Sequence, residues 1–191
     1  LADTEPTVRL TVAQATVRFL GNQYVERDGQ RHKFFAGCLG IFGHGNVAGI
    51  GQALLQDEVE AAEAGVEPAL KYVLGRNEQA MVHTAVGYTR QRDRLQTWAV
   101  TASVGPGATN MLTGAALATI NRLPVLLLPS DTFATRVSAP VLQELELPSS
   151  GDVTVNDAFK PLSRYFDRVW RPEQLPAALL PGTTLVVSPL I

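Results

Sequence analysis

The sequence has little cysteine, no large excess of charge of either sign and no long apolar run, and each of these absences excludes a class of protein. Its 191 residues include one cysteine, Cys38, which excludes an internal disulfide framework and a cysteine-based zinc site. The formal net charge of −2 lacks the basic excess typical of nucleic-acid-binding proteins. No apolar run approaches the ~20 residues of a membrane span, and Leu1–Glu5 lack the basic start of a signal peptide. We therefore expect a cytoplasmic protein with no nucleic-acid and no membrane partner.

What the sequence does contain is the composition and pattern of one globular domain. Hydrophobic residues make up 46% of the chain and charged residues 18%, enough apolar surface for a core. Because most of the apolar segments are continuous runs, they predict strands covered by helices on both faces. The pattern therefore predicts a doubly wound α/β fold with a mostly parallel six-stranded sheet. The predicted strands are 34–42, 70–74, 97–104, 124–128, 165–170 and 184–187.

Segments between these strands have helical periodicity or the composition of loops. Thr11 and Gln14 fit a capping box at the start of the first helix. Residues 57–69 contain five acidic side chains and a proline, which predicts a surface excursion. Residues 130–156 form a long polar connection, of a length that is usually functional. Ligands of such folds bind at the carboxyl ends of the strands, so chemistry is expected in the loops there.

Two of these loops carry side chains that could act on a substrate. Gly43-His44-Gly45-Asn46 places a histidine between glycines, which let the backbone approach a ligand closely. The alternative is a plain turn in which Asn46 caps the next helix. Glu78 follows the second strand, at a helix start. It is either a carboxyl group that exchanges a proton in a cleft or a residue that complements the helix dipole.

The loop after the third strand is Gly105-Pro106-Gly107. A glycine turn that opens a helix favours phosphate binding, but neither G-x-G-x-x-G nor G-x-x-x-x-G-K-[ST] is present, so a dinucleotide site is weakly supported. The three histidines lack the spacing of a metal site. Cys38, between glycines and a leucine, is expected to be an inert buried thiol.

Three segments occur in an order and spacing that is specific when they are taken together. They are R-N-E-Q-A-M-V-H at 76–83, S-V-G-P-G-A-T-N at 103–110 and L-P-V-L-L-L at 123–128. The set resembles the pyrimidine-binding domain of thiamine-diphosphate enzymes of the acetohydroxyacid-synthase-like group. A narrower resemblance at 41–54, 129–136 and 156–161 is to a ring-opening branch of this group that acts on a cyclic polyol dione. Together the resemblance covers roughly residues 7–180.

The resemblance implies roles for particular residues. Glu78 matches the catalytic glutamate, which hydrogen-bonds N1′ of the cofactor's aminopyrimidine. The residues expected to bind thiamine diphosphate are Glu78, Gly105, Pro106, Gly107 and Asn110. The residues expected on the substrate side are His44, Gly45, Asn46, Ser130 and Asp131.

The resemblance also implies what lies outside these residues. In the family the active site lies between two subunits, so a homodimer or higher homo-oligomer is expected, with Mg²⁺ bound by a diphosphate-binding domain and by no residue here. Residues 1–191 should form the pyrimidine-binding domain alone, with 1–9 as a lead-in and 181–191 as an atypical or truncated end. The central and diphosphate-binding domains are absent, so the fragment alone should be inactive. The alternatives are a lyase or synthase acting on 2-keto acids and a non-catalytic binding module.

Overall fold

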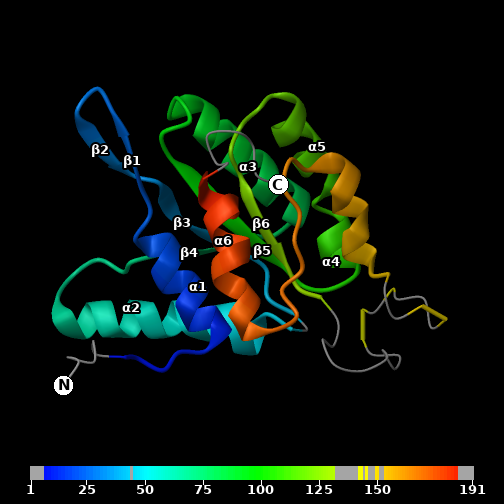
Figure 1. Ribbon diagram of the computed structural model, residues 1–191, viewed down its shortest axis with the longest axis horizontal. Coiled ribbons are helices and arrows are strands. Elements are labelled where there is room, and N and C mark those ends of the chain that lie inside the picture. Colours follow the sequence, from blue (N-terminus) through cyan, green and yellow to red (C-terminus); the bar gives the residue numbers. More distant parts are fainter. Residues whose placement is uncertain are drawn as a thin grey trace, which may run out of the picture.

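Four parallel strands form a central sheet in the computed structural model, which describes residues 7–43, 45–131, 142–143, 145, 149–150 and 153–184 (Figure 1). The strand order is β4-β3-β5-β6, with Gly40 of β3 opposite both Leu74 of β4 and Thr101 of β5. All carboxyl ends therefore lie at one edge, as the α/β prediction requires. The strands are β3 (Phe35–Gly40), β4 (Tyr72–Leu74), β5 (Thr97–Ala102) and β6 (Leu126–Pro129).

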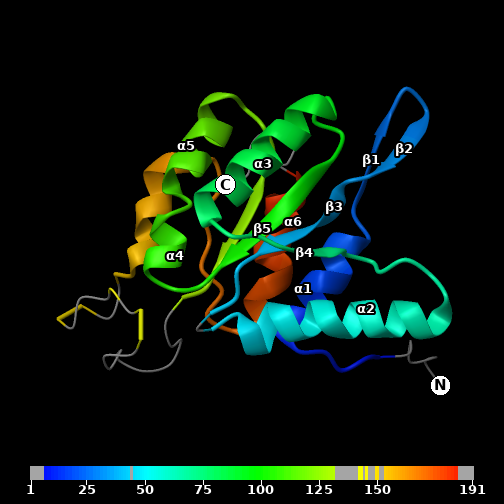
Figure 2. The ribbon, with the colours of Figure 1, turned by 180° about the vertical axis from the view of Figure 1, so that it is seen from behind.

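Helices cover both faces of the sheet. Helices α1 and α6 lie over the face seen in Figure 1, and α3 and α5 over the face seen in Figure 2. Successive residues of a strand point to opposite faces, so Ala99 of β5 packs in the core beside α1 while Val100 packs in the core beside α3 and α5. The helices are α1 (Val12–Gly21), α2 (Gln52–Ala64), α3 (Glu78–Gln91), α4 (Pro106–Thr109), α5 (Leu112–Ile120) and α6 (Leu175–Thr184). Shorter helical turns are η1 (Val47–Gly51), η2 (Val155–Leu162) and η3 (Pro172–Gln174).

Two helix starts follow directly from their capping residues. The predicted capping box is present at α1, where the Thr11 hydroxyl accepts from the Gln14 amide at 3.1 Å and the Gln14 side chain accepts from the Thr11 amide at 2.8 Å. At α3, Asn77 Oδ1 accepts from the Ala80 amide at 2.9 Å. This cap makes Glu78 the first residue of α3, immediately beyond the carboxyl end of β4.

The structure differs from the sequence prediction in three places. Residues 24–33 form a separate antiparallel hairpin of β1 (Tyr24–Arg27) and β2 (Gln30–Lys33), which was not predicted. Most of the predicted excursion at 57–69 belongs to α2, which ends where Gly65 adopts φ 68°. Four of the six predicted strands form the sheet within the described residues; the predicted strand at 165–170 belongs to no ladder. Of the last predicted strand, Thr184 ends α6 and 185–187 lie outside the described residues.

None of the helices in the described part of the chain combines the length and the apolar character that a membrane crossing requires.

Candidate functional site

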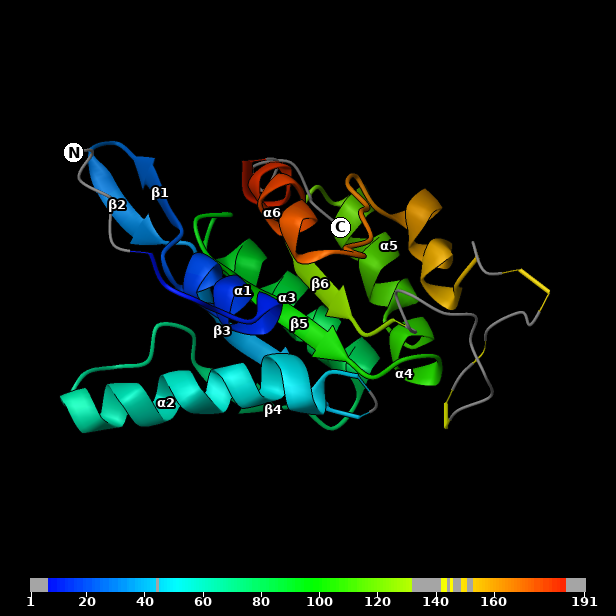
Figure 3. The same ribbon diagram turned by 60° about the horizontal axis from the view of Figure 1, so that its bottom comes forward.

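The candidate site lies at the carboxyl edge of the sheet, where the loops after all four strands meet. Figure 3 shows β5 and β6 pointing to this edge, with α4 and the start of α2 beside it. A parallel sheet brings these loops together although they are far apart in sequence. The predicted residues described by the structure fall in these loops or in the first turns of the helices that follow; His44 lies outside the described residues.

Glu78, Gly107 and Asn110 come together at this edge. Asn110 Nδ2 donates a hydrogen bond to Glu78 Oε2 at 2.7 Å. A Cβ atom at Gly107 would lie 3.4 Å from Glu78 Oε1, so the glycine keeps space open beside that oxygen. Glu78 Oε1 makes no hydrogen bond with any described residue, and the side chain is only half-buried. One carboxylate oxygen is thus fixed while the other stays available to a partner.

Gly105 is needed for the shape of the turn. Its φ of 62° lies in the left-handed region, and a Cβ atom there would overlap the carbonyl oxygen of Gln143. The side chain of Gln143 is held as well, because its Oε1 accepts from the Ser103 hydroxyl at 2.6 Å. The turn predicted to bind the cofactor is therefore closed on one side by a residue from the long connection after β6.

Gln143 is a candidate site residue that the sequence reasoning missed. It lies far along the chain from Ser103, in a segment without periodicity. The one available signal was the length of the 130–156 connection, which indicated a functional loop without indicating which residue returns to the site. Its Nε2 donor has no hydrogen bond to another described residue.

Asn46 ties the first loop to the ends of two strands. Its Nδ2 lies 2.7 Å from Thr101 Oγ1 and 3.2 Å from the carbonyl oxygens of both Ala102 and Leu128. Asn46 stands at the N-cap position of η1, as the plain-turn alternative predicts, but its side chain makes no capping hydrogen bond there. The amide oxygen Oδ1 is left without a hydrogen-bond partner among the described residues and can accept one from a ligand.

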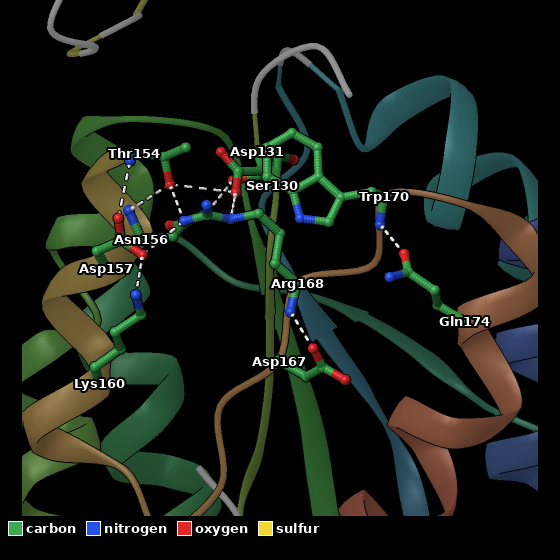
Figure 4. Close-up of polar contacts among 10 residues, drawn as sticks. All are labelled: Ser130, Asp131, Thr154, Asn156, Asp157, Lys160, Asp167, Arg168, Trp170 and Gln174. Atoms are coloured by element: carbon green, nitrogen blue, oxygen red, sulfur yellow. Dashed lines mark hydrogen bonds and ion pairs between the residues drawn. The ribbon is translucent and has the colours of Figure 1, made fainter. Parts of the chain in front are cut away.

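Ser130 and Asp131, which follow β6, are both anchored within the protein. The buried Ser130 hydroxyl donates to the Ala102 carbonyl at 3.0 Å, and a Cβ atom at Gly45 would lie 3.0 Å from Ser130 Cβ. Asp131 Oδ2 forms an ion pair with Arg168 Nε at 3.0 Å (Figure 4). The Ser130 side chain thus lies directly against Gly45. The charge of the Asp131 carboxylate is balanced by the Arg168 guanidinium.

Arg168 is the centre of a polar cluster between β6 and η2 (Figure 4). Its Nη2 donates to Asp157 Oδ1 at 2.7 Å and to Thr154 Oγ1 at 2.8 Å. Lys160 Nζ lies 3.0 Å from the same Asp157 oxygen. Burial raises the pKa of Asp157, but hydrogen bonds from Lys160 and the Thr154 amide, with the charges of Arg168 and Lys160, lower this pKa overall below its usual value. The cluster fixes the loop that carries Ser130 and Asp131.

Cys38 lies in the core on the α1 side of the sheet, 1% exposed, as expected of an inert thiol. Burial raises the pKa of this thiol to about 12. A thiol that stays protonated is a poor nucleophile.

The residues at this edge fit the aminopyrimidine of thiamine diphosphate. That ring needs a carboxyl group at one nitrogen and space for a flat heterocycle beside it. Glu78 supplies a carboxylate with one free oxygen, and Gly107 leaves the space next to it that a side chain would fill.

Comparison with known proteins agrees with this fit. Residues 41–150 match the family model described as thiamine pyrophosphate enzyme, N-terminal TPP binding domain. The chain belongs to this family, which confirms the α/β class and the assignment of a domain that binds thiamine diphosphate.

Similar proteins over nearly the whole chain bear one name, 3D-(3,5/4)-trihydroxycyclohexane-1,2-dione hydrolase. The protein of Geobacillus thermodenitrificans is 51% identical over 96% of this chain and 27% of its own length. The protein of Listeria monocytogenes is 50% identical over 97% of this chain and 28% of its own length. The protein of Lacticaseibacillus casei is 50% identical over 96% of this chain and 27% of its own length. The chain therefore spans little more than a quarter of the length of the curated relatives it matches.

Proposed function

We propose that this chain is the pyrimidine-binding part of a thiamine-diphosphate-dependent hydrolase. The whole enzyme would open the ring of 3D-(3,5/4)-trihydroxycyclohexane-1,2-dione to 5-deoxyglucuronate in myo-inositol catabolism. The observation that carries the proposal is the Glu78 carboxylate, held at Oε2 by Asn110 and open at Oε1 beside Gly107. The shared name of relatives about 50% identical to this chain supports the hydrolase over an enzyme of 2-keto acids.

When bound, thiamine diphosphate supplies the carbon nucleophile that breaks the carbon–carbon bond. The role of this chain is to position the pyrimidine ring and control its proton. Glu78 Oε1 would hold and release a proton at N1′, and Asn110 would keep the carboxylate turned toward that atom. The rigid turn from Gly105 to Gly107 would shape the pocket for the ring.

The substrate side offers a donor and an acceptor. Gln143 Nε2 and Asn46 Oδ1 both lack a partner among described residues, while the other atom of each amide is anchored to the strand ends. A cyclic polyol dione presents carbonyl oxygens that accept and hydroxyl groups that donate. We infer that Gln143 donates to a carbonyl oxygen and that Asn46 accepts from a hydroxyl, with Gly45 and His44 in the same loop.

Three further features belong to the proposal. The active site lies at the interface of a homodimer or larger homo-oligomer, because the pyrimidine-binding part must meet a diphosphate-binding part. Mg²⁺ is held with the diphosphate by that other part. The enzyme works in the cytoplasm, as the single free cysteine suggests for a reducing compartment.

The test uses the longer protein that contains this chain. We expect it to consume the cyclic dione and not pyruvate, with thiamine diphosphate and Mg²⁺ required. Turnover of a 2-keto acid in place of the dione would contradict the proposed substrate but would leave the proposed cofactor in place.

Calorimetry on the 191-residue chain alone should show weak cofactor binding, since the diphosphate half of the site is absent. Tight, Mg²⁺-dependent binding to the chain alone would contradict that expectation.

A further inference from the structure

Thr101, near the carboxyl end of β5, has a hydroxyl group whose proton already has a partner. The side chain is fully buried, and its Oγ1 donates to the Leu128 carbonyl of the neighbouring strand β6 at 2.8 Å. A threonine hydroxyl has one proton to donate and two lone pairs that accept. Because that proton is used, the Thr101 oxygen can only accept a hydrogen bond from a further partner.

The orientation of the Thr101 side chain is fixed by Gly40, its partner on the neighbouring strand β3. A Cβ atom at Gly40 would lie 2.9 Å from Thr101 Cγ2, so the methyl group fills the space that the glycine leaves. A β-branched side chain is stiff about its first torsion angle, and a fixed methyl group therefore fixes the hydroxyl too. The packing of β5 against β3 thus holds the hydroxyl turned toward β6.

The amide nitrogen of Asn46 faces three oxygen atoms of the sheet, and all three are acceptors. Thr101 Oγ1 lies 2.7 Å from Asn46 Nδ2, nearer than the two backbone carbonyl oxygens, which both lie at 3.2 Å. The carbonyl oxygens carry no proton, and the proton of Thr101 is directed at Leu128. Only the NH₂ end of the Asn46 amide can therefore face the sheet.

The opposite orientation of the Asn46 amide is unfavourable for the same reason. It would place Oδ1 where Nδ2 now lies, against three oxygen atoms with no proton available between them. Polar atoms that lose their hydrogen bonds in a half-buried place cost free energy. The sheet therefore determines which end of the amide is presented to a ligand, and that end is the acceptor Oδ1.

We propose that Thr101 is a positioning residue for substrate recognition, which holds the Asn46 amide so that Oδ1 and not Nδ2 is presented at the carboxyl edge of the sheet. The inference rests on the proposed function for the chemical nature of the ligand. An acceptor at this place selects a hydroxyl group, which a polyol dione offers, and opposes the carboxylate of a 2-keto acid. Thr101 is buried and acts on the ligand only through Asn46.

Hydrogen exchange of the Asn46 side-chain amide, followed by NMR in the 191-residue chain, tests the orientation directly. We expect its Nδ2 protons to exchange about tenfold or more slowly than those of the exposed Asn77, whose Nδ2 has no hydrogen bond to a described residue. Thr101→Val keeps the shape of the side chain but removes the oxygen, so it should accelerate the exchange at Asn46 by about tenfold. Thr101→Ser keeps the hydroxyl and should preserve the protection.

Kinetics of the longer protein test the role in recognition. Thr101→Val should raise KM for the cyclic dione by about tenfold and leave hydrogen–deuterium exchange at C2 of thiamine diphosphate unchanged, because only binding on the substrate side is weakened. Thr101→Ser should restore KM. Thr97→Val is the matched control, since Thr97 is also a buried threonine of β5 and donates to the Pro124 carbonyl at 2.6 Å. It should change neither KM nor the protection of Asn46.

Three results would overturn the proposal. The first is exchange at Asn46 as fast as at Asn77 in the unaltered chain, a measurement that decides the matter even if Thr101→Val does not fold. The second is equal protection of Asn46 in Thr101→Val and Thr97→Val. The third is an unchanged KM for the dione in Thr101→Val. A longer protein that does not consume the dione at all would contradict the proposed function instead, and the two exchange measurements would then decide the orientation of the amide.

Discussion

Asn110 Nδ2 and Glu78 Oε2 are 2.7 Å apart, and this hydrogen bond joins the first turn of α3 to the residue that ends α4. Its consequence is that Glu78 presents only Oε1 to a ligand. The two residues therefore act as one unit, and substitutions of the two should not be additive.

Glu78→Gln, in the longer protein with cofactor bound, should slow hydrogen–deuterium exchange at C2 of thiamine diphosphate by roughly 10²–10⁴-fold. The amide keeps the size of the side chain but cannot take and return a proton. Asn110→Ala should slow the same exchange less, and adding it to Glu78→Gln should cost little more. Glu63→Gln, on the exposed side of α2, is the matched control. Exchange rates in Glu78→Gln equal to those of the control would remove Glu78 from the mechanism.

Gly105 and Gly87 give a matched pair of alanine substitutions with opposite expected signs. Gly105 has φ 62° and no room for a Cβ, so Gly105→Ala should destabilise the chain by about 1–3 kcal/mol. Gly87 lies within α3 with nothing within 4 Å of an added Cβ, so Gly87→Ala should stabilise by about 0.4–1 kcal/mol. Thermal unfolding measures both. A stabilised Gly105→Ala would show that the turn can relax away from Gln143.

The sequence predicted the site best where a motif coincides with a strand end. Glu78 could be placed because it closely follows a recognisable strand, and Asn110 because it lies in the S-V-G-P-G-A-T-N segment that resembles the family's turn. Parallel strands bring the loops that carry these two residues together. The position of Gln143 beside Ser103 could not be predicted, because it depends on the path of a long connection that no local sequence pattern encodes. The same limit applies to any contact made only by tertiary packing.

The departures in the fold have local and non-local causes. The hairpin at 24–33 had a readable signal in Asp28-Gly29, the dipeptide of a type I′ turn, and both residues adopt positive φ, 53° and 74°. The segment at 165–170, predicted as a strand, has no regular secondary structure. A strand in a sheet needs a neighbouring strand at hydrogen-bonding distance. Among the described residues, this segment is separated from β6 by a cavity that both of them line.

The Arg168 cluster should make the protein sensitive to acid. The pKa of Asp157 is lowered in the folded state, so its contribution to stability is present above its ordinary value near 4 and is lost as the pH falls through the folded value. Asp157→Asn should destabilise the chain by about 1–3 kcal/mol at pH 7, and the difference from the unaltered chain should shrink below pH 4. Glu58→Gln on the exposed face of α2 serves as the control, and urea unfolding at a series of pH values gives both curves. A difference that stays constant with pH would show that Asp157 acts through packing alone.

Cys38 should make the protein sensitive to alkali in the opposite direction. Burial raises the pKa of its thiol to about 12 in the folded chain, from an ordinary value near 9. Above pH 9 the unfolded chain loses this proton while the folded chain keeps it, so the free energy of unfolding should fall as the pH rises from about 9 to 12, by at most about 1.4 kcal/mol per pH unit. Cys38→Ala should flatten this fall but not abolish it, because burial and the Asp167 carboxylate also raise the pKa of Tyr165 to about 12. A thiol reagent at pH 8 offers an independent check: it should label Cys38 only in unfolded molecules, and rapid labelling of the folded chain would show that the thiol is accessible.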